Sequence, residues 1–216
     1  MSDQCSDGQR LFAAVKATAK AGATVLVVPV GTPVTALLRP IATVPGFLDP
    51  TDVSLLTKWR NQHVKSFLTE FVADDERTAN WLANGVHRNA SKMLFMVESL
   101  TGERLGHVGL GFIDWEKGYG EADAIVSGGD APKGLMKESL RTMLRWARDS
   151  LGLSELAVRV RSDNSAVEFY RKVGFVEYQR IPIVAETTRD GINWSESAQA
   201  KDFVASLVYM RIESLD

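Results

Sequence analysis

The sequence has little cysteine, no long apolar run and almost no surplus of charge. Its 216 residues contain one cysteine, Cys5, so neither an intramolecular disulfide nor a cysteine-based zinc cluster can form. The longest apolar stretch, residues 25–30, is far shorter than the roughly 20 residues that cross a bilayer, which argues against a transmembrane segment. The formal net charge of −2 gives no long-range field for a polyanion. We therefore expect neither nucleic acid nor a membrane as the primary partner.

The overall composition is typical of a folded globular domain, with 45% hydrophobic and 24% charged residues. Asp3 and Asp7 precede the first basic residue, and Lys16 and Lys20 interrupt the apolar segment that follows, unlike a secretory signal. We expect a cytoplasmic protein in which Cys5 is a reduced thiol in a mobile polar segment.

The hydrophobic pattern predicts a mixed order of strands and helices. Strands are expected at residues 24–30, 34–41, 93–97, 105–113, 119–127, 156–161, 175–184 and 203–212. Helices are expected at residues 11–21, after the acidic starts at 49–52 and 74–76, at 136–151 and at 164–173, with a loop at 187–201. In the first of these starts, Asp49 is the expected cap and Asp52 complements the helix dipole. This order indicates an α/β or α+β domain, a mixed sheet covered by helices on both faces. We divide the chain into a helix–strand extension of unclear role, residues 1–33, and a main domain, residues 34–216.

The most informative stretch is residues 125–136, a strand that runs into a glycine-containing loop and then directly into the strongest predicted helix. Free backbone N–H groups at a helix start, with the positive end of the helix dipole, favour a phosphate group. Lys133, Lys137, Arg141 and Arg145 recur every four residues along one face of that helix. We expect Lys133 and Lys137 to meet an anion and the two arginines to be ordinary surface residues.

A second segment, residues 162–175, carries an Asn at 164, an Ala at 166, a Tyr at 170 and a Gly-Phe pair at 174–175. This pattern resembles the C-terminal motif of the GNAT superfamily of N-acetyltransferases. The Trp-Arg-Asn triplet at 59–61 and the element order over 34–212 are similar to the branch that contains the ribosomal-protein acetyltransferases.

The resemblance implies a sheet splayed at its centre, with the pantetheine arm of acetyl-CoA lying in the gap. The strand end Ile125, Val126 and Ser127 and the side chain of Asn164 would contact that arm. The family's pyrophosphate loop, Gln/Arg-x-x-Gly-x-Gly/Ala, aligns with residues 131–136, so Lys133, Gly134, Leu135 and Met136 would contact the phosphates. Ala131 and Met136 depart from the family pattern.

The resemblance also implies direct acyl transfer to an amine, with Tyr170 protonating the departing thiolate. The amine needs a base, and Glu121 and Asp123 are the candidates, because a carboxylate on the strand beside the acyl group can accept the proton directly or through water. Strand periodicity places both acids and Ile125 on one face, opposite Ala122, Ala124 and Val126. His107 is a further candidate base because its ordinary pKa suits the role.

The sequence leaves the identity of the acceptor open. A small amine such as an amino sugar is favoured, because residues 181–203 form a long segment suited to close over a compact molecule. A protein N-terminus and a non-catalytic acyl-CoA sensor are the alternatives. The expected partners are acyl-CoA and an amine, a homodimer is compatible with the sequence, and no spacing of His, Cys or acids indicates a metal. Trp115 and Trp194 fall in connecting regions, as either an acceptor wall or a cover of the core.

Overall fold

A computed structural model describes residues 3–23 and 25–215. The side chain of Cys5 and the first residue of the expected strand at 24–30 lie outside this description. The elements in chain order are α1 (Asp3–Thr18), β1 (Val28–Val30), β2 (Ala36–Pro40), α2 (Pro50–Gln62), the 3₁₀ turn η1 (Val64–Ser66), β3 (Thr69–Glu70), α3 (Asp75–Asn80), the π-helical η2 (Trp81–His87), β4 (Met93–Ser99), β5 (Arg104–Asp114), β6 (Tyr119–Ser127), α4 (Leu135–Leu151), β7 (Glu155–Arg161), α5 (Ala166–Val173), β8 (Phe175–Thr188), β9 (Gly191–Glu196) and β10 (Ala205–Ile212).

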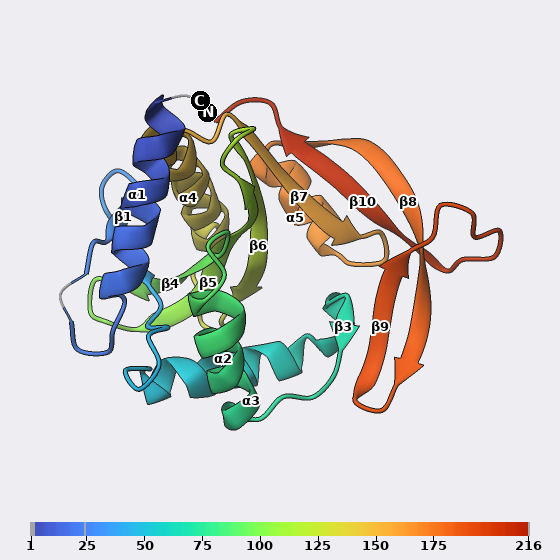
Figure 1. Cartoon of the computed structure of the whole chain (residues 1–216), viewed down its shortest axis with the longest axis horizontal. Helices are drawn as coiled ribbons and strands as arrows, with labels where there is room; N and C mark the ends of the chain where they lie inside the picture. Colours follow the sequence, from blue (N-terminus) through green and yellow to red (C-terminus); the bar gives the residue numbers. More distant parts are fainter. Residues whose placement is uncertain (1–2, 24, 216) are drawn as a thin grey trace.

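The strands form one mixed sheet in the order β1-β2-β4-β5-β6-β7-β10-β8-β9-β3. Among the strands of the described residues, only β6 and β7 pair in parallel, and they pair over just four residues each, Tyr119–Ala122 with Glu155–Val158. Beyond that point the two strands diverge (Figure 1). The splayed, mixed sheet expected from the sequence is therefore present.

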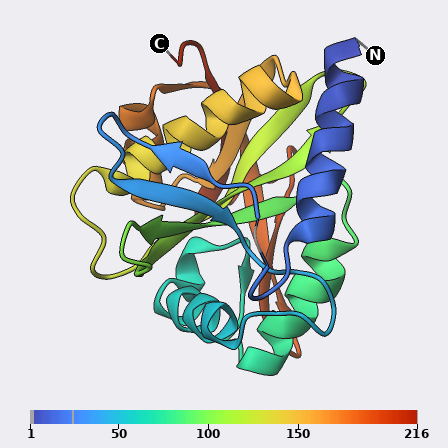
Figure 2. The same cartoon turned by 90° about the vertical axis from the view of Figure 1, so that its left-hand side faces the viewer.

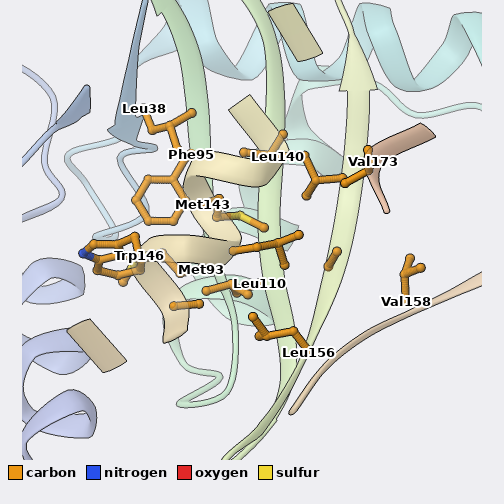
Figure 3. Packing of buried hydrophobic residues seen from close by; sticks show 14 of the residues in the cluster. Leu38, Met93, Phe95, Leu110, Leu140, Met143, Trp146, Leu156, Val158 and Val173 are labelled. Carbon is orange, nitrogen blue, oxygen red and sulfur yellow. The ribbon is translucent and has the colours of Figure 1, made fainter. Parts of the chain in front are cut away.

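Helices cover both faces of the sheet (Figure 2). On one face, α4 and α5 bury the largest apolar cluster, in which Leu140 and Met143 of α4 lie against Phe95 and Leu110 of the sheet (Figure 3). On the other face, Trp59 of α2 and residues of η2 pack on β4 and on Val126 of β6. A small third cluster, around Ile183 and Leu207, lies beneath the β8–β9 hairpin.

The N-terminal extension packs onto this domain. Phe12 and Val15 of α1 are buried in the largest cluster, and Phe12 meets the ring of Trp115 edge-on at 5.4 Å. β1 extends the sheet by pairing with β2. No helix in the described part of the chain is both long and apolar enough to traverse a bilayer.

Two aspartates at the start of α2, Asp49 and Asp52, have different partners. Asp49 caps the helix as expected, accepting from the amides of Thr51 and Asp52. Asp52, expected only to complement the helix dipole, is instead fully buried and accepts from the guanidiniums of Arg39 and Arg104 at 2.7–3.1 Å. This carboxylate thus joins α2 to β2 and β5.

Most expected elements are confirmed to within a few residues, and β6 matches in full. The expected loop at 187–201 is wrong, because β8 continues to Thr188 and β9 follows it. This hairpin projects from the body of the sheet (Figure 1), and most of its residues are exposed or only half-buried. Segment 187–201 holds only two large apolar residues, Ile192 and Trp194, so its alternation is too short to identify a strand.

We expect Asp52→Ala to lower the free energy of unfolding by roughly 3 kcal/mol or more, because it leaves two partly buried guanidiniums without their shared carboxylate. Chemical denaturation measures this loss. The matched control is Asp7→Ala, which removes an ion pair to Arg10 whose side chains are both more than three-quarters exposed. A loss no larger than that of the control would contradict a central role for Asp52.

Candidate active site

A bulge in β6 lies at the point where the sheet splays. Ala124 has a φ of 50°, and the pairing with β5 shifts there, so that His107 opposes Val126 while Gly109 opposes Asp123. After Ala122, β6 has no pairing with β7, while β7 continues its pairing with β10. The two facing strand edges therefore offer backbone hydrogen-bonding groups to a ligand that enters between them.

The bulge also corrects the expected faces of β6. An extra residue reverses the alternation of side chains. Ala122 and Ile125 accordingly contact the cluster beneath α4, whereas Ala124 and Val126 contact the cluster beneath α2. Ile125 does not share a face with the two candidate acids, because strict alternation fails at Ala124.

The loop before α4 presents free backbone donors. The helix begins at Leu135 after Gly134, which has a φ of 90°. In the described part of the chain, no hydrogen bond uses the amides of Lys133, Gly134, Met136 or Lys137 as donors. The side chains of Leu135 and Met136 are buried, and the amide of Leu135 donates to the carbonyl of Pro132 at 3.0 Å, so of these two residues only Met136 keeps a free backbone donor. The donor set fits a phosphate group.

The basic side chains at residues 133, 137, 141 and 145 divide into two pairs. Lys133 and Lys137 are exposed and take part in no ion pair within the described residues. Arg141 and Arg145, expected to be ordinary surface residues, instead hold structure. Arg141 donates to the carbonyl of Val173 at 2.7 Å and Arg145 to that of Leu215 at 3.0 Å. Only the first pair is free to meet an anion.

Tyr170 lies on α5 with its side chain buried against Phe169 and Phe175. Burial, together with the nearby charge of Asp123, raises the pKa of its hydroxyl. The hydroxyl therefore keeps its proton at neutral pH, which is the state that a general acid requires.

Asn164 holds the start of α5 and joins it to the segment after α2. Its side chain accepts from the amide of Ala166 at 2.9 Å and donates to the carbonyl of Ser66 at 3.2 Å. The N-cap residue of α5 is Ser165, so these bonds of Asn164 fix the turn that precedes the helix, and a contact of Asn164 with pantetheine stays a prediction.

The two candidate acids differ in their partners. Glu121 is buried, and both of its oxygens are bound: one accepts from the Tyr119 hydroxyl at 2.7 Å and the other from the Arg159 Nε at 2.7 Å. Asp123 is more accessible, with a side chain 25% exposed, and its Oδ2 lies 2.6 Å from Lys92 Nζ. Asp123 lies over Gly111 of β5, where a Cβ would approach Oδ2 to 2.8 Å.

His107 is not the base that its ordinary pKa suggested. Its ring is fully buried on β5 and stacks on Trp59 at 6.0 Å. This burial lowers the pKa of His107 to about 4, so the ring is neutral at pH 7 and cannot hold a proton taken from an amine.

The structure shows the surroundings of Trp115 and Trp194, the two tryptophans expected in connecting regions. Trp115 covers the core beneath α1. Trp194 belongs to β9, and its indole nitrogen donates to Glu70 Oε1 at 2.6 Å. The same oxygen accepts from Arg161 at 2.6 Å, and the Arg161 guanidinium lies 4.2 Å from the Trp194 ring centroid. We call these three residues the Glu70 clamp; it holds the β8–β9 hairpin to β3, which itself pairs with β9.

A splayed sheet, a helix start with unused backbone amides and a buried protonated tyrosine are the features expected of an acyl-CoA transferase site. No group of three or more potential metal ligands occurs among the described residues. The family model of the acetyltransferase (GNAT) domain matches residues 47–176, more than half of the chain. The chain belongs to the GNAT acetyltransferase family and is an acetyl-CoA-dependent N-acetyltransferase.

Solved structures share the fold at low sequence identity. A probable acetyltransferase of the GNAT family from Chromobacterium violaceum has a TM-score of 0.65 at 16% identity, covering 89% of each chain. A dodecameric spermidine N-acetyltransferase from Vibrio cholerae has a TM-score of 0.58 at 19% identity, covering 82% of this chain and 93% of that one. No curated protein sequence matches the chain.

We expect Lys133→Ala combined with Lys137→Ala to weaken acetyl-CoA binding by about tenfold and to reduce its dependence on salt, because two unpaired cations are lost beside the phosphate site. Calorimetric titration at two ionic strengths measures both effects. Lys201→Ala, which removes another exposed lysine, is the control. Unchanged affinity in the double variant would exclude the two lysines from the site.

Acid should destabilise the fold through His107. The unfolded chain takes up this proton near pH 6.5 but the native ring only near pH 4, so stability is lost as the pH falls between these values. The shift corresponds to roughly 3 kcal/mol at its full extent. Denaturation of wild type and His107→Gln between pH 7 and pH 4 measures it, and identical pH dependence in both proteins would contradict this account.

Proposed function

We propose that the enzyme acetylates a small-molecule amine, with Asp123 as the base and Tyr170 as the acid. The observation that carries this assignment is the position of Asp123 at the end of the β6–β7 pairing, accessible and held by one lysine. Glu121, the other acid that the sequence offers as a base, has both oxygens occupied and is better suited to hold Arg159 in place.

The chain's own residues would divide the work as follows. Acetyl-CoA supplies the thioester acyl group, and the free amides before α4 with Lys133 and Lys137 would hold its phosphates. Ile125, Val126 and Ser127 would offer their backbone to the pantetheine arm. Asp123 would accept the proton of the incoming ammonium, and Tyr170 would donate one to the departing sulfur. Orientation in the gap would supply much of the rate.

The side of the site formed by β3 and the β8–β9 hairpin supports a small acceptor. The Glu70 clamp and the pairing of Thr69 with Asn193 close the β8–β9 hairpin against β3. A peptide N-terminus, as in the ribosomal-protein branch, would need an open groove along this side. The closed hairpin instead favours a compact molecule.

Charge on this side of the sheet is mixed, because Arg60, which donates to the carbonyl of Thr69, and Arg77, which stacks on Phe71, lie beside Glu70. Glu70 and Asp163 share the single cation Arg161. Glu196 accepts from the Tyr209 hydroxyl and takes part in no ion pair within the described residues. We favour a di- or polyamine over an amino sugar because the Vibrio cholerae neighbours that share the fold are spermidine N-acetyltransferases.

The test is release of CoA thiol from acetyl-CoA with separate amines: spermidine, putrescine, glucosamine and a peptide with a free N-terminus. We expect the polyamines to give the highest kcat/KM and the peptide to give none. Turnover of the peptide alone would overturn the proposal in favour of a protein acceptor.

Variants assign the roles within the same assay. We expect Asp123→Asn and Tyr170→Phe each to lower kcat by 10²-fold or more while acetyl-CoA affinity stays within about twofold, because general acid–base groups act in the transition state. Glu121→Gln is the comparison. A larger loss of kcat in Glu121→Gln than in Asp123→Asn would reverse the assignment of the base.

A further inference from the structure

Lys16 is a buried cation that joins the N-terminal helix to the far side of the sheet. It lies in the last turn of α1 and is only 8% exposed. Its ammonium donates to the carbonyls of Val86 at 2.8 Å, Lys92 at 2.9 Å and Asn89. These three carbonyls belong to the end of η2 and the turn that leads into β4.

The chemistry of this contact is specific to an ammonium group. Lysine carries three N–H donors and no acceptor, and each donor here meets one carbonyl. A positive charge is also favoured at the C-terminal end of a helix, where η2 ends at His87. Burial lowers the pKa of Lys16 to about 8, so the group still carries its proton at neutral pH.

The segment that Lys16 holds ends at a residue of the candidate active site. Lys92 accepts from Lys16 with its carbonyl and bonds back to Asn89 with its amide at 3.2 Å. Its own ammonium lies 5.4 Å from the centroid of the Trp81 ring and 2.6 Å from Asp123 Oδ2. An unbroken chain of contacts therefore runs from α1 to the carboxylate at the splay.

We propose that Lys16 is a positioning residue for acetyl transfer: it fixes residues 86–92 so that Lys92 holds the Asp123 carboxylate at the gap between β6 and β7. This proposal rests on the proposed role of Asp123. It gives the extension at residues 1–33 a function in the reaction. Attachment of α1 itself is secured separately by Phe12 and Val15 in the core.

A double-mutant cycle tests the chain of contacts. Lys16→Met, Lys92→Met and the double variant are compared in kcat/KM for the amine. We expect Lys16→Met alone to lower kcat/KM about fivefold. In the Lys92→Met background it should lower kcat/KM less than twofold, because its effect passes through Lys92. Acetyl-CoA affinity should stay unchanged. Lys20→Met, which removes an exposed lysine beyond the end of α1, should have no effect.

A second variant, Lys16→Gln, distinguishes a positioning role of Lys16 from a general loss of folding. Lys16→Gln keeps two N–H donors without the charge, so it should give a smaller change in kcat/KM than Lys16→Met. Hydrogen exchange at the amides of residues 86–92 should rise in the same order. Faster exchange confined to α1, with unchanged kcat/KM, would show a role in attaching the helix only and would overturn the proposal.

The two proposals fail in different ways. Equal effects of Lys16→Met with and without Lys92, alongside an inactive Asp123→Asn enzyme, would overturn the positioning role alone. Wild-type kcat/KM in Asp123→Asn would overturn the assignment of the base and with it the positioning role.

Discussion

The interruption of pairing between β6 and β7 is the constraint on which the rest of the structure depends. A parallel pair that ends after four residues leaves two strand edges that need hydrogen-bonding partners. The bulge at Ala124 bends β6 away while keeping it paired with β5. The same bulge turns Val126 towards α2 and Ile125 towards α4, so one irregular residue shapes both the donor gap and the side chains that flank it.

A sheet opened in its middle must be held together elsewhere. On one face, α4 lies across the strands and is anchored through Arg141 to α5 and through Arg145 to the end of the chain. On the other face, Asn164 bonds to Ser66 and the Glu70 clamp joins β3 to β9. These contacts join elements that lie on the two sides of the splay.

Much of this arrangement could be predicted from the sequence, because local patterns encode it. The amphipathic stripe of α4, the Asp49 cap and the alternation in β7 each depend on neighbours in the chain, and the motif around Tyr170 indicated the family. The bulge at Ala124 could not be read, since alanine has no preference for a positive φ.

Long-range partners were equally hidden. The buried state of Asp52, the occupied oxygens of Glu121 and the three carbonyls around Lys16 all depend on residues distant in the sequence. His107 has an ordinary titrating side chain until its burial is known. In each case the residue type was visible, and its environment, which decides its chemistry, was not.

The β8–β9 hairpin is under different sequence constraints from the rest of the domain. Its residues contribute little to the main core, whose largest cluster draws only Phe175 from β8 and none from β9. Substitutions in the hairpin therefore have little effect on the packing of the main core. The residues of β6, α4 and α5 are constrained both by packing and by the chemistry of the acetyl-CoA site. An enzyme built in this way can change its acceptor over evolutionary time while its acetyl-CoA machinery stays as it is.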